Sequence, residues 1–199
     1  MSVVKVLAIL GSPNTEGTSN QMLTKYCDGV AKAAAEKGVK VEVKKIVLSQ
    51  KQYSPCKFCT SCYKTGKCAL KDDLNDVLDD FVNSDIVVHA FPIWYFGMPG
   101  FVKVYVDRWT SLYNPHWAGF RSEIADKMKG KVTAVLSVCG APNADEMCES
   151  SISVFRTTFN LSRVIKWAGS VSTAGSKMEK ALVDSEKLGE DSFALFLEK

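Results

Sequence analysis

Four of the seven cysteines in this 199-residue chain lie in one short stretch, with a spacing suited to electron-transfer chemistry. They form the pattern C-x2-C-x2-C-x5-C, as Cys56, Cys59, Cys62 and Cys68. Three thiolates spaced in this way can wrap one edge of an iron-sulfur cube, and a fourth can close another corner. Zinc sites usually join two cysteine pairs across a longer loop. The spacing therefore favours a [4Fe-4S] cluster, with free or redox-active thiols, zinc and a structural disulfide as alternatives.

The residues within and beside this four-cysteine stretch suit a tightly folded loop that carries the negative charge of thiolates. Pro55 fixes the backbone where the loop begins, and Gly66 allows a sharp turn before the last cysteine. Lysine side chains would offset the charge of the thiolates; they are Lys57, Lys64, Lys67 and Lys71.

A second polar stretch, from Gly11 to Asn20, joins the first expected strand to the first expected helix. It has no Walker lysine and no G-x-G-x-x-G pattern. Backbone amides at the helix start, together with hydroxyl groups, suit a terminal monophosphate better than a pyrophosphate. The alternative is a plain turn with a Ser or Thr helix cap. The candidate cofactor-binding residues here are Ser12, Asn14, Thr18, Ser19 and Asn20.

A third stretch, residues 90–100, places several aromatic side chains in a loop beside prolines and glycines. Such side chains make a poor surface unless they meet a flat apolar partner. An isoalloxazine ring is such a partner, and the alternative is a place in the core or in a dimer interface. The candidate residues are Pro92, Ile93, Trp94, Tyr95, Phe96 and Gly97.

The hydrophobic pattern supplies a scaffold for these stretches, as strands that alternate with helices. Strands are expected at 3–10, 39–48, 85–91, 131–138 and 164–171, and helices at about 19–37, 72–81, 100–113, 145–161 and 176–196. The alternation predicts an α/β fold with a five-stranded parallel sheet covered on both faces. Ligands bind such sheets at the carboxyl ends of the strands. We expect one domain over residues 1–199, with a cysteine-rich insert loop at about 54–71.

The order of these motifs resembles one known family. The chain reads G-S-P-x3-G-T-S after the first strand, G-K-C-x3-D-D at the end of the cysteine loop, P-I-W-Y and M-x-G after the third strand, and then Lys103 with Asp107 and Arg108. Over about residues 3 to 140 this order resembles the NADPH-dependent FMN reductase family of flavodoxin-like proteins. The four-cysteine loop resembles the iron-sulfur flavoprotein branch of that family.

The resemblance implies a flavodoxin-like three-layer sandwich that binds FMN at a dimer interface. The phosphate would lie on the first loop and the ring against residues 92–97. A third flavin-contacting loop would follow the fourth strand at Cys139 and Gly140, where backbone groups bind and the Cys139 thiol packs as a small hydrophobe. The chain departs from the family pattern at Phe91, where threonine is usual, and at Phe96, where glycine is frequent.

Other reactive side chains are expected to have structural roles. His89 lies inside a strand and is expected in the core. His116 is expected in a surface or interface loop, and Asp107 and Arg108 are expected to form an ion pair, either on their helix or across a dimer. We find no carboxylate pair, Ser-His-Asp set or activated lysine, so no catalytic side chain is assigned; a flavin would carry the electron chemistry itself.

Charge and composition exclude some partners. The net charge of +3 gives no case for nucleic-acid or membrane binding. The N-terminus has no secretory signal pattern, so we expect a cytoplasmic protein in which paired disulfides are disfavoured. Exposed aromatic loops predict self-association, and the resemblance implies a homodimer or homotetramer.

The function expected from these motifs is that of an FMN-dependent oxidoreductase. Electrons would pass from a donor through a [4Fe-4S] cluster to FMN and an acceptor. One alternative is a cluster-free NAD(P)H-dependent FMN or quinone reductase, and another is a non-catalytic redox carrier or sensor. The redox partner is a small molecule or a protein, with a ferredoxin-type donor or NAD(P)H as candidate donors.

Overall fold

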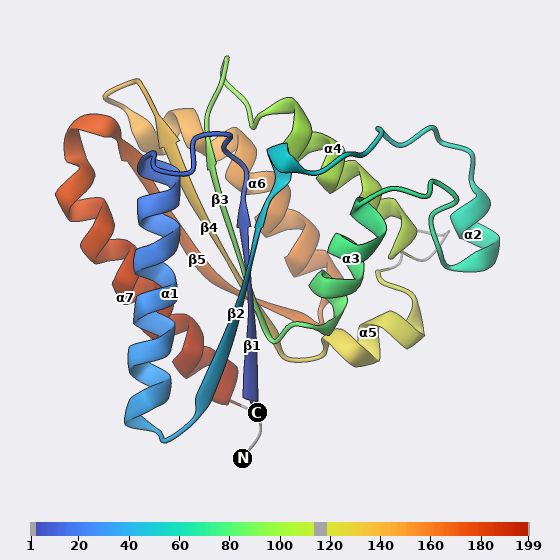
Figure 1. Ribbon diagram of the computed structural model, residues 1–199, viewed down its shortest axis with the longest axis horizontal. Helices are drawn as coiled ribbons and strands as arrows, with labels where there is room; N and C mark the ends of the chain where they lie inside the picture. The colour runs from blue at the N-terminus through green and yellow to red at the C-terminus, as the bar shows by residue number, and fades with distance from the viewer. Residues whose placement is uncertain (1–2, 114–118, 199) are drawn as a thin grey trace.

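The computed structural model describes residues 3–113 and 119–198 as a parallel β-sheet enclosed by helices (Figure 1). The strands are β1 (Val3–Leu10), β2 (Lys40–Val47), β3 (Ile86–Pro92), β4 (Lys131–Cys139) and β5 (Ile165–Ala174). The α-helices are α1 (Thr18–Glu36), α2 (Ser61–Thr65), α3 (Leu74–Asn83), α4 (Gly100–Arg108), α5 (Ser122–Met128), α6 (Ala144–Ser162) and α7 (Met178–Leu197). Short 3-10 turns are η1 (Leu48–Gln50), η2 (Trp109–Ser111) and η3 (Gly175–Lys177).

The strand order is β2-β1-β3-β4-β5, with every pairing parallel. Because β1 lies between β2 and β3, the direction of chain progression across the sheet reverses at β1. This order is that of the flavodoxin-like fold, in which ligands bind beside the reversal, beyond the carboxyl ends of β1 and β3. The sheet therefore fixes where the loops that follow β1, β3 and β4 must meet.

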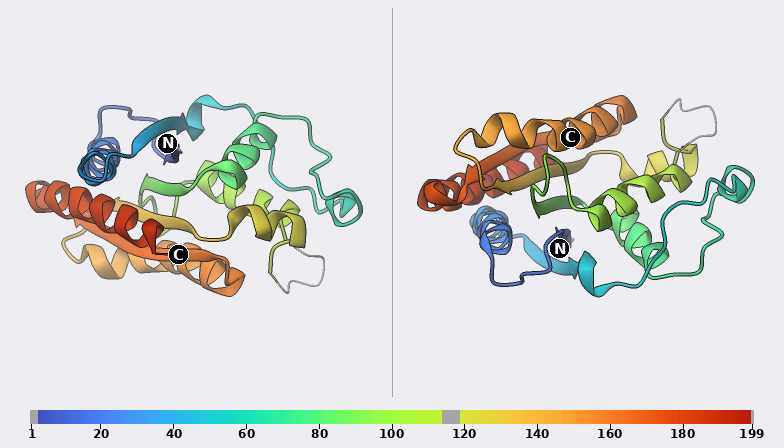
Figure 2. Two further views of the ribbon diagram at one scale, coloured as in Figure 1. Left: turned by 90° about the horizontal axis from the view of Figure 1, so that it is seen from below. Right: turned by 90° about the horizontal axis from the view of Figure 1, so that it is seen from above.

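Each face of the sheet has its own hydrophobic layer, because successive strand residues point to opposite faces. Along β1, Leu7 and Ile9 pack with α3, α4 and α6, whereas Val6 and Ala8 pack with α1 and α7. Figure 2 shows α1 and α7 side by side on one face of the sheet. The result is the three-layer α/β/α sandwich that the sequence predicts.

The contact between α1 and α7 is a close approach of two backbones. A Cβ atom added to Gly189 would lie 2.1 Å from the Tyr26 carbonyl oxygen, and one added to Gly29 would lie 2.0 Å from the Glu186 carbonyl oxygen. Only glycine fits at such distances. These two glycines let the helices lie close enough to cover β1, β3 and β4 together.

The five strands and five long helices lie where the hydrophobic pattern predicts them. The expected helix over 100–113 ends at Arg108 and continues as the turn Trp109–Ser111. The sequence pattern missed α2 and α5, which are five and seven residues long and too short for helical periodicity to stand out. Among the described residues, no helix is long and apolar enough to cross a bilayer.

Candidate functional site

Three loops meet at the carboxyl edge of the sheet, at the top of Figure 1. The first begins at Gly11, whose N–H donates to the Ala90 carbonyl oxygen of β3 at 2.7 Å. A Cβ on Gly11 would lie 2.4 Å from Val102 Cγ2, so this residue must be glycine for the loop to run against α4. The loops after β1 and β3 are thereby held side by side, as the fold requires of a cofactor site.

The loop after β1 is internally braced and leaves the start of α1 uncapped. Ser12 is buried, and its Oγ accepts the Asn14 N–H at 3.2 Å, while Asn14 Oδ1 accepts the Glu16 N–H at 3.0 Å. The residue before α1, Gly17, gives no side-chain cap, so the first N–H groups of this helix are available to an anion. The loop has the donors that a phosphate group needs.

Two further candidates lie in the first turn of α1. Ser19 is buried. The side chain of Asn20 bridges the Thr15 carbonyl oxygen and the Lys45 ammonium group of β2. Asn20 thus fixes the loop and places a positive charge beside it, which favours an anionic ligand.

The loop after β3 is a two-residue hairpin that extends beyond the sheet. The Ile93 N–H donates to Val138 of β4 at 2.7 Å, and Trp94 and Gly97 exchange backbone hydrogen bonds of 2.8 and 3.2 Å. Tyr95 and Phe96, at the tip, have φ values of 50° and 65°. Positive φ at both central residues is the requirement of a type I′ turn, which favours Asn and Gly rather than aromatic residues.

The tip is also unusually exposed for its composition. Tyr95 is 99% exposed and Phe96 70% exposed, with the two rings edge to face at 6.0 Å. Ser150 of α6 donates its hydroxyl to the Phe96 carbonyl oxygen at 3.2 Å, which ties the tip to the scaffold. An aromatic pair held outward in a strained turn makes this tip a candidate contact for a partner or ligand.

The loop after β4 presents backbone rather than side chains. Cys139 is buried and donates its thiol to the Ala141 carbonyl oxygen at 3.2 Å, as a packed small residue does. A Cβ on Gly140 would have no neighbour within 4 Å, so the backbone there is open to a ligand. The expectation that Cys139 packs as a small buried residue is confirmed, and the role of Gly140 stays a prediction.

The cysteine loop lies elsewhere, on the flank of the molecule beside α3, α4 and α5 (Figures 1 and 2). Cys56, Cys59, Cys62 and Cys68 are free thiols that line one shallow hollow together with Phe58 and Thr110. Burial raises the pKa of the Cys62 thiol, and the charges of Cys68, Cys56 and Cys59 raise it further, because all four cysteines lie near one another. Four thiols on one loop are the ligand type that an iron-sulfur cluster requires.

The thiols are not closed around a common point. Among the residues that the structure describes, no three His, Cys, Asp or Glu side chains are gathered as the ligands of a metal ion. The loop is nevertheless braced at its far turn: the Arg121 guanidinium donates to the Cys62 carbonyl oxygen, and Gly66 adopts φ 71° to end α2.

Arg108, at the end of α4, holds the two ends of the cysteine loop. Its guanidinium makes a bidentate pair with Asp72, at 2.8 and 3.1 Å, and donates to the Ser54 carbonyl oxygen at 3.0 Å. Burial raises the pKa of Asp72, but hydrogen bonds from Arg108 and Ser54 outweigh this and hold it below its usual value.

The expected pairing of Asp107 with Arg108 on their own helix is therefore wrong. Asp107 instead pairs with Lys103 one turn earlier, at 2.6 Å and in solvent. Adjacent residues on a helix point in different directions, whereas residues four apart face each other. Arg108 points inward, where it is 1% exposed, and Asp107 points outward.

With this geometry in place, comparison with known proteins identifies the family. A family model described as NADPH-dependent FMN reductase matches residues 4–175. The chain belongs to this family. An oxidoreductase from Corynebacterium diphtheriae superposes with a TM-score of 0.65 over 100% of both chains at 15% identity, which shows the shared fold alone.

Several relatives of this FMN reductase family member carry the name iron-sulfur flavoprotein. One from Methanocaldococcus jannaschii is 30% identical over 105 residues, covering 53% of this chain and 51% of that protein. One from Methanosarcina thermophila is 26% identical over 143 residues, covering 72% and 67% of the two chains. The chain spans about half the length of the first curated relatives it matches, at 51% and 45%.

Of the two histidines in the chain, only His89 lies within the described residues. His89 is buried among aromatic rings with its Nε2 atom 3.3 Å from the Tyr105 hydroxyl, and burial lowers its pKa to about 3. It is a neutral core residue, as expected. His116 lies outside the described residues.

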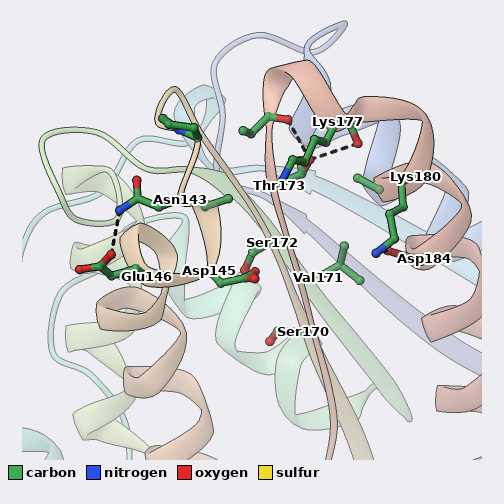
Figure 3. A pocket seen from close by; sticks show the side chains of 14 residues that line it. Asn143, Asp145, Glu146, Ser170, Val171, Ser172, Thr173, Lys177, Lys180 and Asp184 are labelled. Carbon is green, nitrogen blue, oxygen red and sulfur yellow. Dashed lines mark hydrogen bonds and ion pairs between the residues drawn. The ribbon is translucent and has the colours of Figure 1, made fainter.

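A hollow of about 570 Å³ between α6 and α7, at the open edge of β5, was not expected from the sequence (Figure 3). Ser170 and Ser172 of β5 line it, Lys180 lies 3.3 Å from Asp184, and Asn143 donates to Glu146 at 2.8 Å. Its polar residues carry no pattern of spacing in the sequence. It adjoins the loop after β4 but offers no reactive group of its own.

Proposed function

We propose that this chain is an iron-sulfur flavoprotein, an FMN-dependent oxidoreductase whose four-cysteine loop holds a [4Fe-4S] cluster. The observation that carries the proposal is that Cys56, Cys59, Cys62 and Cys68 line one hollow in a member of an FMN reductase family. Bound FMN exchanges one or two electrons and a cluster exchanges one, so the pair would link a one-electron donor to a two-electron acceptor.

The three loops at the carboxyl edge are the proposed FMN site. The uncapped start of α1, with Ser12, Thr18 and Ser19, would bind the phosphate, and Asn20 would support that loop. The hairpin 94–97 would orient the ring and exclude water from one side of it. The open backbone at Gly140 would donate or accept hydrogen bonds at the ring edge.

The two departures from the family pattern differ in their consequences. Phe91 is fully buried and stacks on Phe155 with ring centroids 5.5 Å apart, so its side chain belongs to the core rather than to the flavin loop. Phe96 lies at the exposed tip of the hairpin, where it would add apolar area to the proposed ring contact.

The proposed assembly is a homodimer or homotetramer. Within one chain the cysteine loop lies on the flank and the hairpin at the carboxyl edge, so the two regions are separate (Figure 2). We infer that the cysteine loop of one chain approaches the FMN loops of another. The exposed rings of Tyr95 and Phe96 supply apolar surface for such a contact.

The proposed function is tested by separating the cluster from the flavin. We would compare the wild-type protein with Cys59→Ser and with Cys27→Ser, a half-buried cysteine of α1 whose pKa is raised by burial to about 12. We expect Cys59→Ser to keep FMN but to lose iron. Its flavin should then no longer be reduced by a ferredoxin-type donor. We expect Cys27→Ser to match the wild type.

The alternative of a cluster-free reductase gives a different result. It predicts that NADPH alone bleaches the flavin rapidly and equally in all three proteins, and that none of them holds iron. A redox carrier or sensor would instead bind flavin without turnover of quinones or oxygen.

A further inference from the structure

Arg108 has one more hydrogen-bond donor than loop closure requires. A guanidinium carries five N–H groups. The two on Nη1 donate to the Ser54 carbonyl oxygen and to Asp72, and the two on Nη2 donate to Asp72 and to Asn75 Oδ1, the last at 3.2 Å. The fifth, on Nε, is buried and has no partner among the described residues. A buried donor without a partner is costly, so this one needs an explanation.

A candidate acceptor is the sulfur of Cys68, the last cysteine of the loop, which lines the same hollow as Thr110, two residues after Arg108. Burial lowers the pKa of Arg108, but hydrogen bonding with Asp72 and the charges of Cys68 and Asp72 outweigh this effect and raise the pKa above its usual value. Cys68 is half-buried, whereas Cys56 and Cys59 are exposed. Cys62 is half-buried as well, but Cys68 is the cysteine that interacts with the Arg108 guanidinium.

We propose that Arg108 is a positioning residue for the iron-sulfur site, whose Nε–H donates a hydrogen bond to the Cys68 sulfur while its other donors close the loop. The effect on a cluster rests on the proposed function, whereas the contact between Arg108 and Cys68 does not. The hydrogen bond distinguishes Cys68 from the other three ligands. Because it stabilises negative charge on sulfur, it raises the reduction potential of a bound cluster.

The first test compares Arg108→Lys with Arg156→Lys, an arginine of α6 that pairs with Glu149 on the surface. Lysine keeps the positive charge and loses the Nε–H and the planar fork. After anaerobic reconstitution, an EPR-monitored titration of Arg108→Lys should give a more negative potential than the wild type, with FMN content unchanged. Arg156→Lys should match the wild type. Equal potentials in Arg108→Lys and wild type would overturn the proposal.

The second test needs no cluster and no change at Arg108. In iron-free protein labelled with ¹⁵N, the Nε–H signal of Arg108 should shift in Cys68→Ala and stay in place in Cys27→Ala. A signal that is the same in both variants would overturn the proposal. A wild-type protein without iron would contradict the proposed function, and this signal would still decide whether Arg108 contacts Cys68.

Discussion

Replacing the hairpin tip Tyr95 and Phe96 by Asn and Gly should stabilise the flavin-free protein while weakening FMN binding. Both residues have positive φ, which costs about 1–2 kcal/mol per non-glycine residue. Asn-Gly is the preferred pair in a type I′ turn. The exchange would relieve most of that strain without changing the path of the hairpin.

Little stabilisation is lost in return, because the two side chains are 99% and 70% exposed and bury almost no apolar area. Their edge-to-face contact is worth about 0.5–1.5 kcal/mol. The balance is a gain of about 1–2 kcal/mol, or about 2–8 °C in Tm for a chain of this size. Loss of the ring contact should weaken FMN binding by a factor of about ten or more, which corresponds to about 1.4 kcal/mol.

The assay is thermal unfolding of flavin-free protein, followed by titration with FMN monitored by flavin fluorescence. Phe58→Gly is the matched control, since Phe58 also has positive φ, at 49°, and is 72% exposed, but lies in the cysteine loop. It should raise the Tm and leave FMN affinity unchanged. A hairpin variant that is less stable, or that binds FMN as the wild type does, would refute the reasoning.

Three further predictions concern the scaffold. Burial lowers the pKa of Lys131 from 10.5 to about 7, so above pH 7 the unfolded chain holds a proton that the folded chain has lost. The free energy of unfolding should therefore rise between pH 7 and 9, by up to about 1.4 kcal/mol per pH unit. Lys131→Met should remove this rise, as measured by urea titrations at several pH values. Gly189→Ala should destabilise the protein by about 1–3 kcal/mol through its 2.1 Å clash with α1, whereas Gly175→Ala, with open space around it, should change the denaturation midpoint little. Asp72→Asn should lower the free energy of unfolding by about 2–4 kcal/mol, because it breaks the nearly buried ion pair with Arg108. Asp107→Asn, which removes the exposed pair with Lys103, should lower it by about 0–1 kcal/mol, and chemical unfolding measures both.

The strands and long helices can be predicted from the sequence because each one is marked by a long, uninterrupted stretch of hydrophobic periodicity. Continuous apolar strands and helical repeats mark every strand and long helix, and their alternation leads to the parallel sheet. The two missed helices, α2 and α5, are short and stabilised by contacts from elsewhere, such as that of Arg121 with the Cys62 carbonyl oxygen. No local pattern reports a contact of that kind.

The candidate site likewise has features that the sequence shows and contacts that only the structure shows. The cysteine spacing and the aromatic loop are visible in the sequence, and the structure places the four cysteines around one hollow. The pairing of Asp72 with Arg108 is not visible, because it joins residues 36 positions apart and depends on which face of α4 turns inward. The strain at Tyr95 is likewise a property of the fold, since the residue type alone gives no sign of positive φ.

The central claim is tested most directly by counting iron, acid-labile sulfide and FMN per chain in protein purified without oxygen. The account predicts about four irons, about four sulfides and about one FMN per chain, with iron and sulfide lost when Cys56, Cys59, Cys62 and Cys68 are replaced by serine. FMN without iron or sulfide in the anaerobically purified wild type would contradict it.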